Sequence, residues 1–469
     1  MNVFYRRWWG AWLVFWLWPA LVHAQFSYTI ANNQATVSAY TGSGGAVVIP
    51  GSILTYPVVG IASSVFANQT SITSITLTNS LVTVGDSAFF GCSGLTSIAF
   101  PDSVTNLGAG ICFNCTGLTN ATIGSGILSI GNGMFYGCSA LASCSIAAGR
   151  INIPDEMFNS CGQLTRLVLP RNIGSIGTGS FYKCTGLTNA PIGTNITVIG
   201  LDAFGYDTGL TNISFPNTLT NIGDGAFYQC TGLTSLVLPG SVIAIGGDVF
   251  YSCTGLTNLV FGTNLTSIGT YAFWGCTGLS TVVLPNSLTS LGDYAFYNCS
   301  GVHNLTLSTN LTSIGNWVFT YCNISSLIIP AGITSIGDYA LGGWYFVTTS
   351  IYFMGNAPTQ GAGVCQGDYG TVYYLPGTTN WISNYSELPT ELWNPQAQTH
   401  DGYFGIRTNQ FGFNITGNNN LLVTVEACTN LANPVWVPLA TNTLVGGTAY
   451  FGDANWANYR GRFYRLNFP

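Results

Sequence analysis

A period of 23 residues constrains this chain more than any other feature. Residues 253–275, CTGLTNLVFGTNLTSIGTYAFWG, follow the pattern of residues 230–252, CTGLTSLVLPGSVIAIGGDVFYS. One position of the repeat is cysteine in every unit but one, where Asp207 replaces it: Cys92, Cys115, Cys138, Cys161, Cys184, Cys230, Cys253, Cys276, Cys299 and Cys322. A fixed period of this size is typical of proteins built from stacked repeats.

Phenylalanine fills a second position of the repeat, and only Cys112 interrupts it. Each unit holds two short alternating apolar runs, such as the one with Leu233, Leu236 and Leu238, and these runs predict β-strands. No unit can bury its apolar face alone, so neighbouring units must stack. We therefore expect a mainly β solenoid of about twelve rungs, with the Leu, Ile and Phe positions pointing inward.

The segments outside the repeat predict terminal β structure. Residues 25–65 do not repeat and hold alternating apolar runs, which indicate an N-terminal β cap over the first open rung. The solenoid then spans residues 66–345, and a closing rung and cap follow over residues 346–390. Residues 392–395 and the polar run QAQTHDG are an expected linker. The runs FGFNI, LLVTVEA, WVPLA and RFYRLNF predict a small antiparallel β domain over residues 391–469.

The first 24 residues have the pattern of an export signal. Arg6 and Arg7 precede an apolar run over residues 8–17, and Val22-His23-Ala24 fits a small-residue cleavage site. We expect a signal peptide over residues 1–24 and a secreted or cell-surface location, with an uncleaved anchor as the alternative. Charged residues make up 6% of the chain and the net charge is −6, which argues against a nucleic-acid partner because such binding needs clustered Lys and Arg.

The motifs L-T-S-I-x-L-P, S-L-T-S-I-G and A-F-x-x-C recur through well over half of the chain. In these motifs the chain resembles the leucine-rich repeats of the BspA type, found in secreted and surface proteins of bacteria and some parasitic protists. The resemblance implies a leucine-rich repeat solenoid, an extracellular location, and binding of protein or surfaces, often in adhesion, without catalysis. Two stretches depart from the pattern: residues 144–160, where Cys144 and Arg150 replace inward leucines, and the unit at Cys322, which is one residue short.

The C-terminal segment also resembles modules that are appended to exported bacterial proteins of several architectures. A tail that is shared among different proteins suits attachment to the outer surface, so this role is a hypothesis for residues 391–469.

The cysteine column permits two interpretations. Adjacent members would lie about 5 Å apart, which a disulfide tolerates. Buried free thiols would pack equally well as a small apolar stripe, and we favour this interpretation. Cys112 and Cys115 have CxxC spacing, but a second CxxC or a nearby histidine for a redox or zinc site is missing.

Aspartate recurs after the Ile-Gly step of the repeat, at Asp86, Asp155, Asp224, Asp293 and Asp338, with Asn132 and Asn316 at equivalent positions. We expect each side chain to cap the short helical turn that follows it, by accepting a hydrogen bond from a free backbone N–H. Calcium binding is the alternative, but Ala109, Thr178, Leu201 and Thr270 interrupt the column, and oxygen ligands must converge on one ion.

The sequence offers no catalytic constellation. The only histidines after residue 24 are His303 and His400, and there is no HExxH, G-x-S-x-G or phosphate loop. We expect His303 to be a solvated surface residue and predict neither a catalytic site nor a cofactor or metal. A polysaccharide-active enzyme is the least favoured alternative.

Two sets of side chains are candidate binding residues. The residue after the Phe column is often aromatic, and we expect these rings to stack from rung to rung, either as mutual packing or as a platform for sugar rings or a protein: Phe90, Phe113, Tyr136, Tyr182, Tyr228, Tyr251, Trp274 and Tyr297. The cations of the solenoid all fall between residues 150 and 183, where they form a cluster for an acidic glycan or protein patch or a chance grouping: Arg150, Arg166, Arg171 and Lys183.

The outward strand positions provide a third surface. One column is Ser, Thr or Asn, while the next turns apolar at Val237, Val260, Val283 and Ile328 and predicts a contact stripe. Our leading hypothesis is a non-catalytic protein that binds an extracellular protein or glycan. Self-assembly of the rods into a surface layer is the alternative, and the sequence does not decide the oligomeric state.

Overall fold

The computed structural model describes residues 25–147, 149, 151–170, 172–344, 348–393, 395–418 and 421–467. The predicted signal peptide and the candidate binding residues Arg150 and Arg171 lie outside these ranges. The chain divides into two compact units, Met1–Asn310 with Gly315–Asn323 and Leu311–Ile314 with Ile324–Pro469, and each is described by itself.

The N-terminal residues form the predicted β cap. Strand β1 (Phe26–Ala31) pairs antiparallel with β2 (Gln34–Tyr40), and β2 pairs parallel with β5 (Tyr56–Ile61). β5 in turn pairs parallel with β7 (Thr83–Val84), the first short strand of the repeats, so the cap leads directly into the solenoid. The remaining strands of this region are β3 (Gly45–Val48), β4 (Ser52–Ile53) and β6 (Ile72–Thr76).

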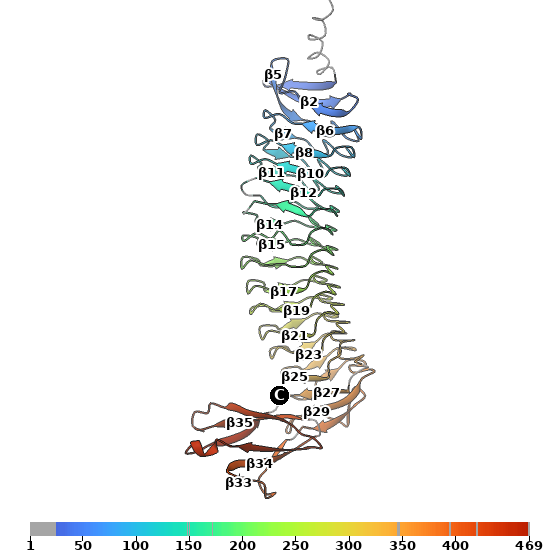
Figure 1. The fold of residues 1–469 in the computed structure, drawn as a ribbon. Coiled ribbons are helices and arrows are strands. Elements are labelled where there is room, and N and C mark those ends of the chain that lie inside the picture. Colours follow the sequence, from blue (N-terminus) through green and yellow to red (C-terminus); the bar gives the residue numbers. More distant parts are fainter. Residues whose placement is uncertain are drawn as a thin grey trace, which may run out of the picture. The chain divides into compact units, whose positions relative to one another are not determined.

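Each rung of the first unit contributes to two columns of parallel strands, which Figure 1 shows stacked from blue to yellow. The first column consists of β8 (Ser97–Phe100), β10 (Asn120–Ile123), β12 (Ser143–Ile146), β13 (Arg166–Val168), β17 (Ser235–Val237), β19 (Asn258–Val260), β21 (Thr281–Val283) and β23 (Asn304–Thr306). The second consists of β7, β9 (Asn106–Leu107), β11 (Ser129–Ile130), β14 (Ser175–Ile176), β15 (Val198–Ile199), β16 (Asn221–Ile222), β18 (Ala244–Ile245), β20 (Ser267–Ile268) and β22 (Ser290–Leu291).

Register between rungs follows the sequence period. In the parallel pair β17–β19, Leu236 faces Leu259, 23 residues later. In the first column, the rungs of Asn189 and Asn212 form only isolated β-bridges and no strands. Pro191 follows in this stretch, and a proline has no N–H to donate to a strand ladder.

The core of the first unit is made of columns of identical side chains. The Phe227 side chain is fully buried, and its ring stacks at 5.2 Å on Phe204 and at 5.4 Å on Phe250. Offset stacking adds about 0.5–1.5 kcal/mol per pair to the burial of each ring. The predicted leucine-rich repeat solenoid with inward Leu, Ile and Phe columns is therefore confirmed.

All fourteen cysteines are free and buried, which confirms structural thiols and makes the disulfide alternative wrong. Each thiol of the column donates to a backbone carbonyl of the preceding rung, as Cys230 Sγ does to Phe204 O at 3.1 Å and Cys253 Sγ to Phe227 O at 3.2 Å. Burial raises the pKa of Cys253 to about 12, so this thiol stays protonated and unreactive.

Asp207 occupies the cysteine position between the rungs of Cys184 and Cys230. It is fully buried, and neither carboxylate oxygen has a hydrogen-bond partner. Burial raises the pKa of this carboxyl well above its ordinary value, so the neutral acid is the form that the core favours.

The recurring aspartates accept hydrogen bonds from other backbone N–H groups than we expected. Asp86 Oδ1 accepts from the N–H of Ala109 at 2.8 Å, and Asp224 Oδ1 accepts from the N–H of Gly247 at 2.9 Å. Both donors belong to the next rung, 23 residues further on, and the segment after each aspartate is a non-helical turn. The predicted cap on the aspartate's own turn is thus wrong, since the side chain ties two rungs together.

The second unit begins with the last repeats. Strand β24 (Ser313–Ile314) pairs with β26 (Ser335–Ile336), 22 residues later, so the structure contains the short unit seen in the sequence. β26 pairs with β28 (Thr359–Gln360). A five-stranded sheet beside them contains β25 (Ser326–Ile329), β27 (Thr348–Phe353), β29 (Tyr369–Tyr374), β31 (Leu388–Leu392) and β30 (Asn384–Tyr385).

The C-terminal residues form two antiparallel sheets. The first contains β32 (Gln396–Gln398), β33 (Gly405–Arg407), β34 (Gln410–Thr416) and β37 (Thr448–Asp453), and the second contains β35 (Leu422–Cys428), β36 (Val437–Thr443) and β38 (Phe463–Asn467). A short 3-10 helix, η1, spans Trp456–Asn458. The expected linker is wrong in part, because Gln396–Gln398 pair with β34 as a strand.

One core joins these sheets to the closing rungs. Tyr352 and Tyr373 of the parallel sheet and the fully buried Trp393 cluster with Phe413 and Val423 of the C-terminal sheets. Ile328 packs against the same cluster, so the last member of the predicted contact stripe is already covered.

Candidate functional site

Both histidines of the described residues lie at the surface. His303 is exposed, as expected, and its Nδ1 lies 3.2 Å from the carbonyl oxygen of Asn323. His400 is also exposed and lies beside Thr399. Within the described ranges, no group of three His, Cys, Asp or Glu side chains is arranged to hold a metal ion. The same residues contain no helix of the length and hydropathy that a membrane span requires.

A continuous row of mostly half-buried aromatic rings follows the turn after the Phe column, and we call it the aromatic ladder. The rings from Tyr228 to Tyr297 stack face to face, whereas the contacts toward Tyr182 and Tyr321 at the two ends are tilted or edge-on. Successive ring centroids lie 4.4–5.9 Å apart through Tyr182, Tyr206, Tyr228, Tyr251, Trp274, Tyr297 and Tyr321. The tightest contact is Tyr251 on Trp274, at 4.4 Å and 5° between ring planes. The sequence identified five of these seven residues and missed Tyr206 and Tyr321.

Backbone conformation explains the two missed rings. Tyr206 (φ 62°) and Tyr321 (φ 61°) lie in the left-handed region, and the signal that could have shown it is Gly or Asn at the same repeat position in other rungs, as at Gly91 and Asn114. Gly205 occupies the repeat position that is aromatic in the neighbouring rungs, and the ring of Tyr206, the next residue, takes its place in the ladder. A Cβ at Gly205 would lie 2.9 Å from the Tyr182 ring, so glycine lets the neighbouring ring fill the gap.

A second aromatic column runs beside the ladder. Tyr271 stacks on Tyr294 at 4.9 Å, and Tyr294 stacks on Trp317 at 5.9 Å. All three residues have φ of 58°, at a repeat position that is Asp or Gly in the preceding rungs. Their 23-residue spacing was a readable signal, but nothing in the pattern showed that they face the ladder.

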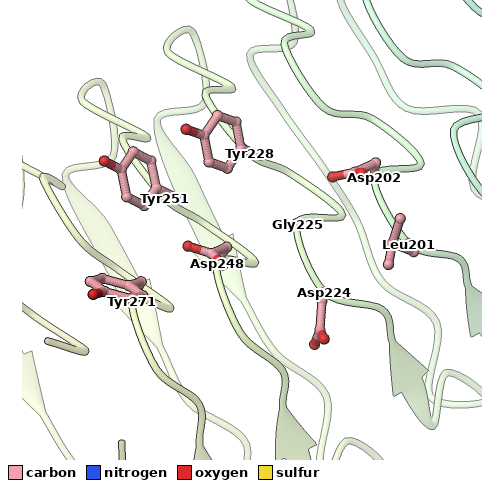
Figure 2. A pocket seen from close by; sticks show the side chains of 8 residues that line it. All are labelled: Leu201, Asp202, Asp224, Gly225, Tyr228, Asp248, Tyr251 and Tyr271. Carbon is pink, nitrogen blue, oxygen red and sulfur yellow. The ribbon is translucent and has the colours of Figure 1, made fainter. Parts of the chain in front are cut away.

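An open surface pocket of about 640 Å³, which we call the Asp–Tyr pocket, lies beside the ladder and the first ring of the second column, Tyr271. Figure 2 shows its lining residues, with Tyr228 and Tyr251 on successive rungs and Asp202 and Asp248 on either side of Gly225. The lining is Leu201, Asp202, Asp224, Gly225, Tyr228, Asp248, Tyr251 and Tyr271. Gly225 has φ of 62°, and a Cβ there would lie 2.3 Å from Asp202 Oδ1, so glycine leaves room for that carboxylate.

The pocket is lined by three carboxyl groups and by no lysine or arginine. Burial, and then repulsion from Asp248 and Asp224, raises the pKa of Asp202 above its ordinary value. Burial and the charge of Asp224 likewise raise the pKa of Asp248. Burial raises the pKa of Tyr228 and Tyr251, so their hydroxyls stay protonated. The pocket therefore combines excess negative charge with aromatic faces.

The predicted cations occupy different parts of the repeat. Arg166 is exposed in strand β13, where it pairs with Ser143 of the preceding rung. Lys183 lies in the turn, with its Nζ 5.1 Å from the ring centre of Tyr182 and 5.5 Å from that of Tyr206. Lys183 thus lies at the start of the aromatic ladder. Beside Arg166, a cavity of about 400 Å³ opens where Ala190 and Pro191 replace larger strand residues.

The earlier rungs carry only a short version of the ladder. Phe90 stacks on Phe113 at 5.4 Å, and Phe113 stacks on Tyr136 at 4.5 Å. Asn159 follows at the same repeat position and ends the stack. This short stack consists of predicted residues and gives a natural comparison for the longer one.

Comparison with known proteins agrees with the fold. A family model described as BspA type leucine rich repeat region, in six copies, matches residues 59–188, 111–234 and 220–347. A leucine-rich repeat protein from Bacteroides ovatus ATCC 8483 is similar at 26% identity and a TM-score of 0.63, over 75% of this chain and 94% of that one. A comparison with curated proteins finds no match.

Two further solved structures share lower similarity. A leucine rich cell surface protein from Faecalibacterium prausnitzii A2-165 has 24% identity and a TM-score of 0.45, over 75% of this chain and 93% of that one. A leucine-rich repeat protein from T. pallidum has 22% identity and a TM-score of 0.25, over 60% and 89% of the two chains.

The stacked parallel rungs and their inward columns define a leucine-rich repeat solenoid. Because the matching ranges together cover more than half of the chain, the protein belongs to the BspA-type leucine-rich repeat family.

Proposed function

We propose that this is a non-catalytic, secreted or cell-surface protein whose solenoid binds an extracellular protein or glycan, in adhesion or a related surface interaction. The aromatic ladder is the observation that carries the proposal. Seven rings, Tyr182 to Tyr321, follow one another along one edge of the first unit, and aromatic side chains contribute strongly to binding interfaces.

Half-burial gives the ladder suitable physical properties for recognition. Each ring is held by its neighbours in the stack, so little side-chain entropy is lost when a partner binds. The edge needs no rearrangement to present its rings. The export-type N-terminal sequence and the low fraction of charged residues, 6%, support a function outside the cell.

A binding screen tests this function. The mature full chain is presented to matrix proteins and a glycan array, beside the variant Tyr228→Ala/Tyr251→Ala/Trp274→Ala. The matched control is Phe90→Ala/Phe113→Ala/Tyr136→Ala, which removes three rings from the same repeat position. We expect at least one ligand that the first variant loses and the control retains. Absence of any ligand, or equal loss in both variants, would refute the proposal.

Self-assembly is a second candidate, favoured by one observation. Val237, Val260 and Val283 are 53%, 47% and 55% exposed at one outward strand position, as predicted, and form an apolar stripe. A monodisperse monomer in light scattering at high protein concentration would count against assembly through this stripe.

Attachment through the C-terminal sheets remains part of the proposal, with one consequence from the fold. Because Trp393 and Val423 share a core with Tyr352 and Tyr373, deleting the sheets would expose a large apolar surface on the closing rungs. Attachment is therefore better tested by surface substitutions in the full chain than by truncation.

A further inference from the structure

We propose that the Asp–Tyr pocket and the adjoining aromatic ladder form a groove for an extended, basic polypeptide segment of a partner protein. Lysine or arginine side chains of the segment would lie beside Asp202 and Asp248, with their alkyl parts against Tyr228, Tyr251 and Tyr271. The inference rests on the proposed binding function and adds the chemical class of the ligand.

Charge selects a cationic occupant. No lysine or arginine occurs between Lys183 and Arg407. The rungs that carry the ladder from Tyr206 to Tyr321 therefore contain acidic residues but no lysine or arginine. In the described part of the chain, both ion pairs lie in the C-terminal sheets, at Asp453 and Glu426. Asp202 and Asp248 are thus partly buried carboxylates without a cationic partner there, and a bound cation would remove their mutual repulsion.

The ladder already binds one cation. The ammonium of Lys183 lies over the rings of Tyr182 and Tyr206, which are two rungs and one rung before Tyr228. Cation–π contacts of this kind contribute favourably, more so for partly desolvated rings. A neutral glycan would stack on the same rings but would leave the carboxylates unpaired, and an acidic glycan would be repelled by them.

Spacing selects an extended chain over a compact amine. Asp202 and Asp248 are separated by one rung, Gly225, so two strand spacings of about 4.8 Å place them roughly 10 Å apart along the edge. A polyproline II chain advances about 9.3 Å in three residues and returns to the same face. Basic side chains at every third position would therefore reach both carboxylates, and aromatic grooves are known to bind such chains.

A peptide titration tests the inference. The probe is a synthetic peptide of four Arg-Pro-Pro repeats, and the neutral and acidic comparisons replace arginine by glutamine or glutamate. Binding to the full mature chain is measured by calorimetry at low and high salt. We expect the arginine peptide to bind more tightly than either comparison, with an affinity that falls as salt rises.

Variants locate the binding. Asp202→Asn/Asp248→Asn should weaken the arginine peptide by about tenfold or more, since charge pairing is lost while the ring faces remain. The matched control is Glu156→Gln, because Glu156 occupies the same repeat position with φ of 57°. It should bind like the unmodified chain. Charge reversal in Asp248→Lys should abolish binding.

The outcomes separate this inference from the proposed function. If the arginine peptide does not bind, or binds equally to Asp202→Asn/Asp248→Asn, the inference is wrong. If a ligand from the screen depends on Tyr251 and Trp274 but not on the two aspartates, the binding function stands and the basic-segment inference falls. Tighter binding of the glutamine peptide or of a neutral glycan at this groove would also overturn it.

Discussion

The rungs around Phe113 and those around Tyr251 have similar interiors but different edges. In both regions a buried column of mostly phenylalanine and a buried column of mostly cysteine run through the core; Cys112 replaces the phenylalanine of the Phe113 rung, and Asp207 replaces the cysteine of one later rung. At the edge, the earlier rungs stack three rings and then stop at Asn159, whereas the later rungs carry a seven-ring ladder, a second aromatic column and the Asp–Tyr pocket.

This comparison separates two kinds of repeat position. The core positions hold the solenoid together, and the turn positions at the edge differ from one part of the solenoid to another. The interior must repeat because each rung supplies the other half of its neighbour's core. The turn positions at the edge carry no such constraint, and they range from Gly133 through Asp248 to Tyr294 at one and the same repeat position. Under the function proposed above, these variable turn positions would be the ones that recognise a partner.

The largest expected effect lies in the interior. Phe227→Ala removes a fully buried ring between two stacked neighbours and should lower the free energy of unfolding by about 3–5 kcal/mol. Phe158→Ala, in the rung where the shorter edge stack ends, also removes a fully buried ring between two stacked neighbours and should cost a similar amount. Chemical denaturation followed by circular dichroism measures both. A cost that differs severalfold between the two would contradict the equivalence of the interiors.

A second effect concerns the one rung that breaks the cysteine column. Asp207→Cys should raise the free energy of unfolding near neutral pH by about 2 kcal/mol, because it replaces an unpaired buried carboxyl by a thiol that donates like its neighbours. The groups that face Asp207 in the column are the Cys184 and Cys230 thiols, which are themselves held protonated by burial that raises their pKa.

The pH dependence of this gain has a defined sign. Burial raises the pKa of Asp207 in the folded chain, so between its unfolded value and its folded value the folded state binds more protons. The stability of the unmodified protein is therefore largest below the unfolded pKa and falls as pH rises from about 4. The advantage of Asp207→Cys should grow over the same range, and a constant advantage would show that the carboxyl does not titrate there.

Much of the fold was predictable because the period fixes which residues repeat their environment. The Leu236 and Phe227 columns could be placed inward from sequence alone, and the short unit at Cys322 appeared as a 22-residue register. The candidate site was harder to predict from the sequence than the fold. Left-handed backbone at Asp202, Asp248 and Tyr271 decides that these side chains line one pocket, and the only signal for it in the sequence is that other rungs, such as those of Gly133 and Gly225, have glycine at the same repeat position.

The aspartate contacts were misjudged for a related reason. The turn sequence after Asp86 allows a local cap, but the nearest free N–H belongs to Ala109 in the next rung. Contacts between rungs depend on the stacking distance, which the sequence of one unit does not contain. The same holds for the C-terminal sheets, whose shared core with Tyr352 and Tyr373 replaces the linker that polar composition suggested.

A smaller effect follows from the contacts between rungs. Asp293→Ala removes two hydrogen bonds, from the Asn316 backbone N–H at 2.7 Å and from its Nδ2 at 3.1 Å, and should cost about 1–2 kcal/mol. Asp86→Ala removes one exposed bond and should cost about 0.5–1 kcal/mol. Thermal unfolding of both variants, with Asn replacements as controls, measures the order of the two costs. A reversed order would contradict this account of the hydrogen bonds between rungs.

A similarly small effect on stability is expected at the edge. Trp274→Ala should change the free energy of unfolding by only about 1 kcal/mol, because the ring is half-buried and packs on Tyr251 and Tyr297. Phe113→Ala should behave in the same way. If Trp274→Ala unfolded the chain as Phe227→Ala is expected to, the ladder would be part of the core, and its role in binding would lose its support.

The most direct test is a hydrogen-exchange footprint of the full mature chain with and without a bound ligand, either one from the matrix-protein and glycan screen or the arginine peptide. Recognition through the later rungs predicts slower exchange at the turn amides between Asp202 and Tyr297, with the turns between Ser87 and Tyr136 unchanged. Equal protection of both regions, or protection confined to the strands of the Val237–Val283 stripe, would contradict the claim that the edge of the later rungs is the binding surface.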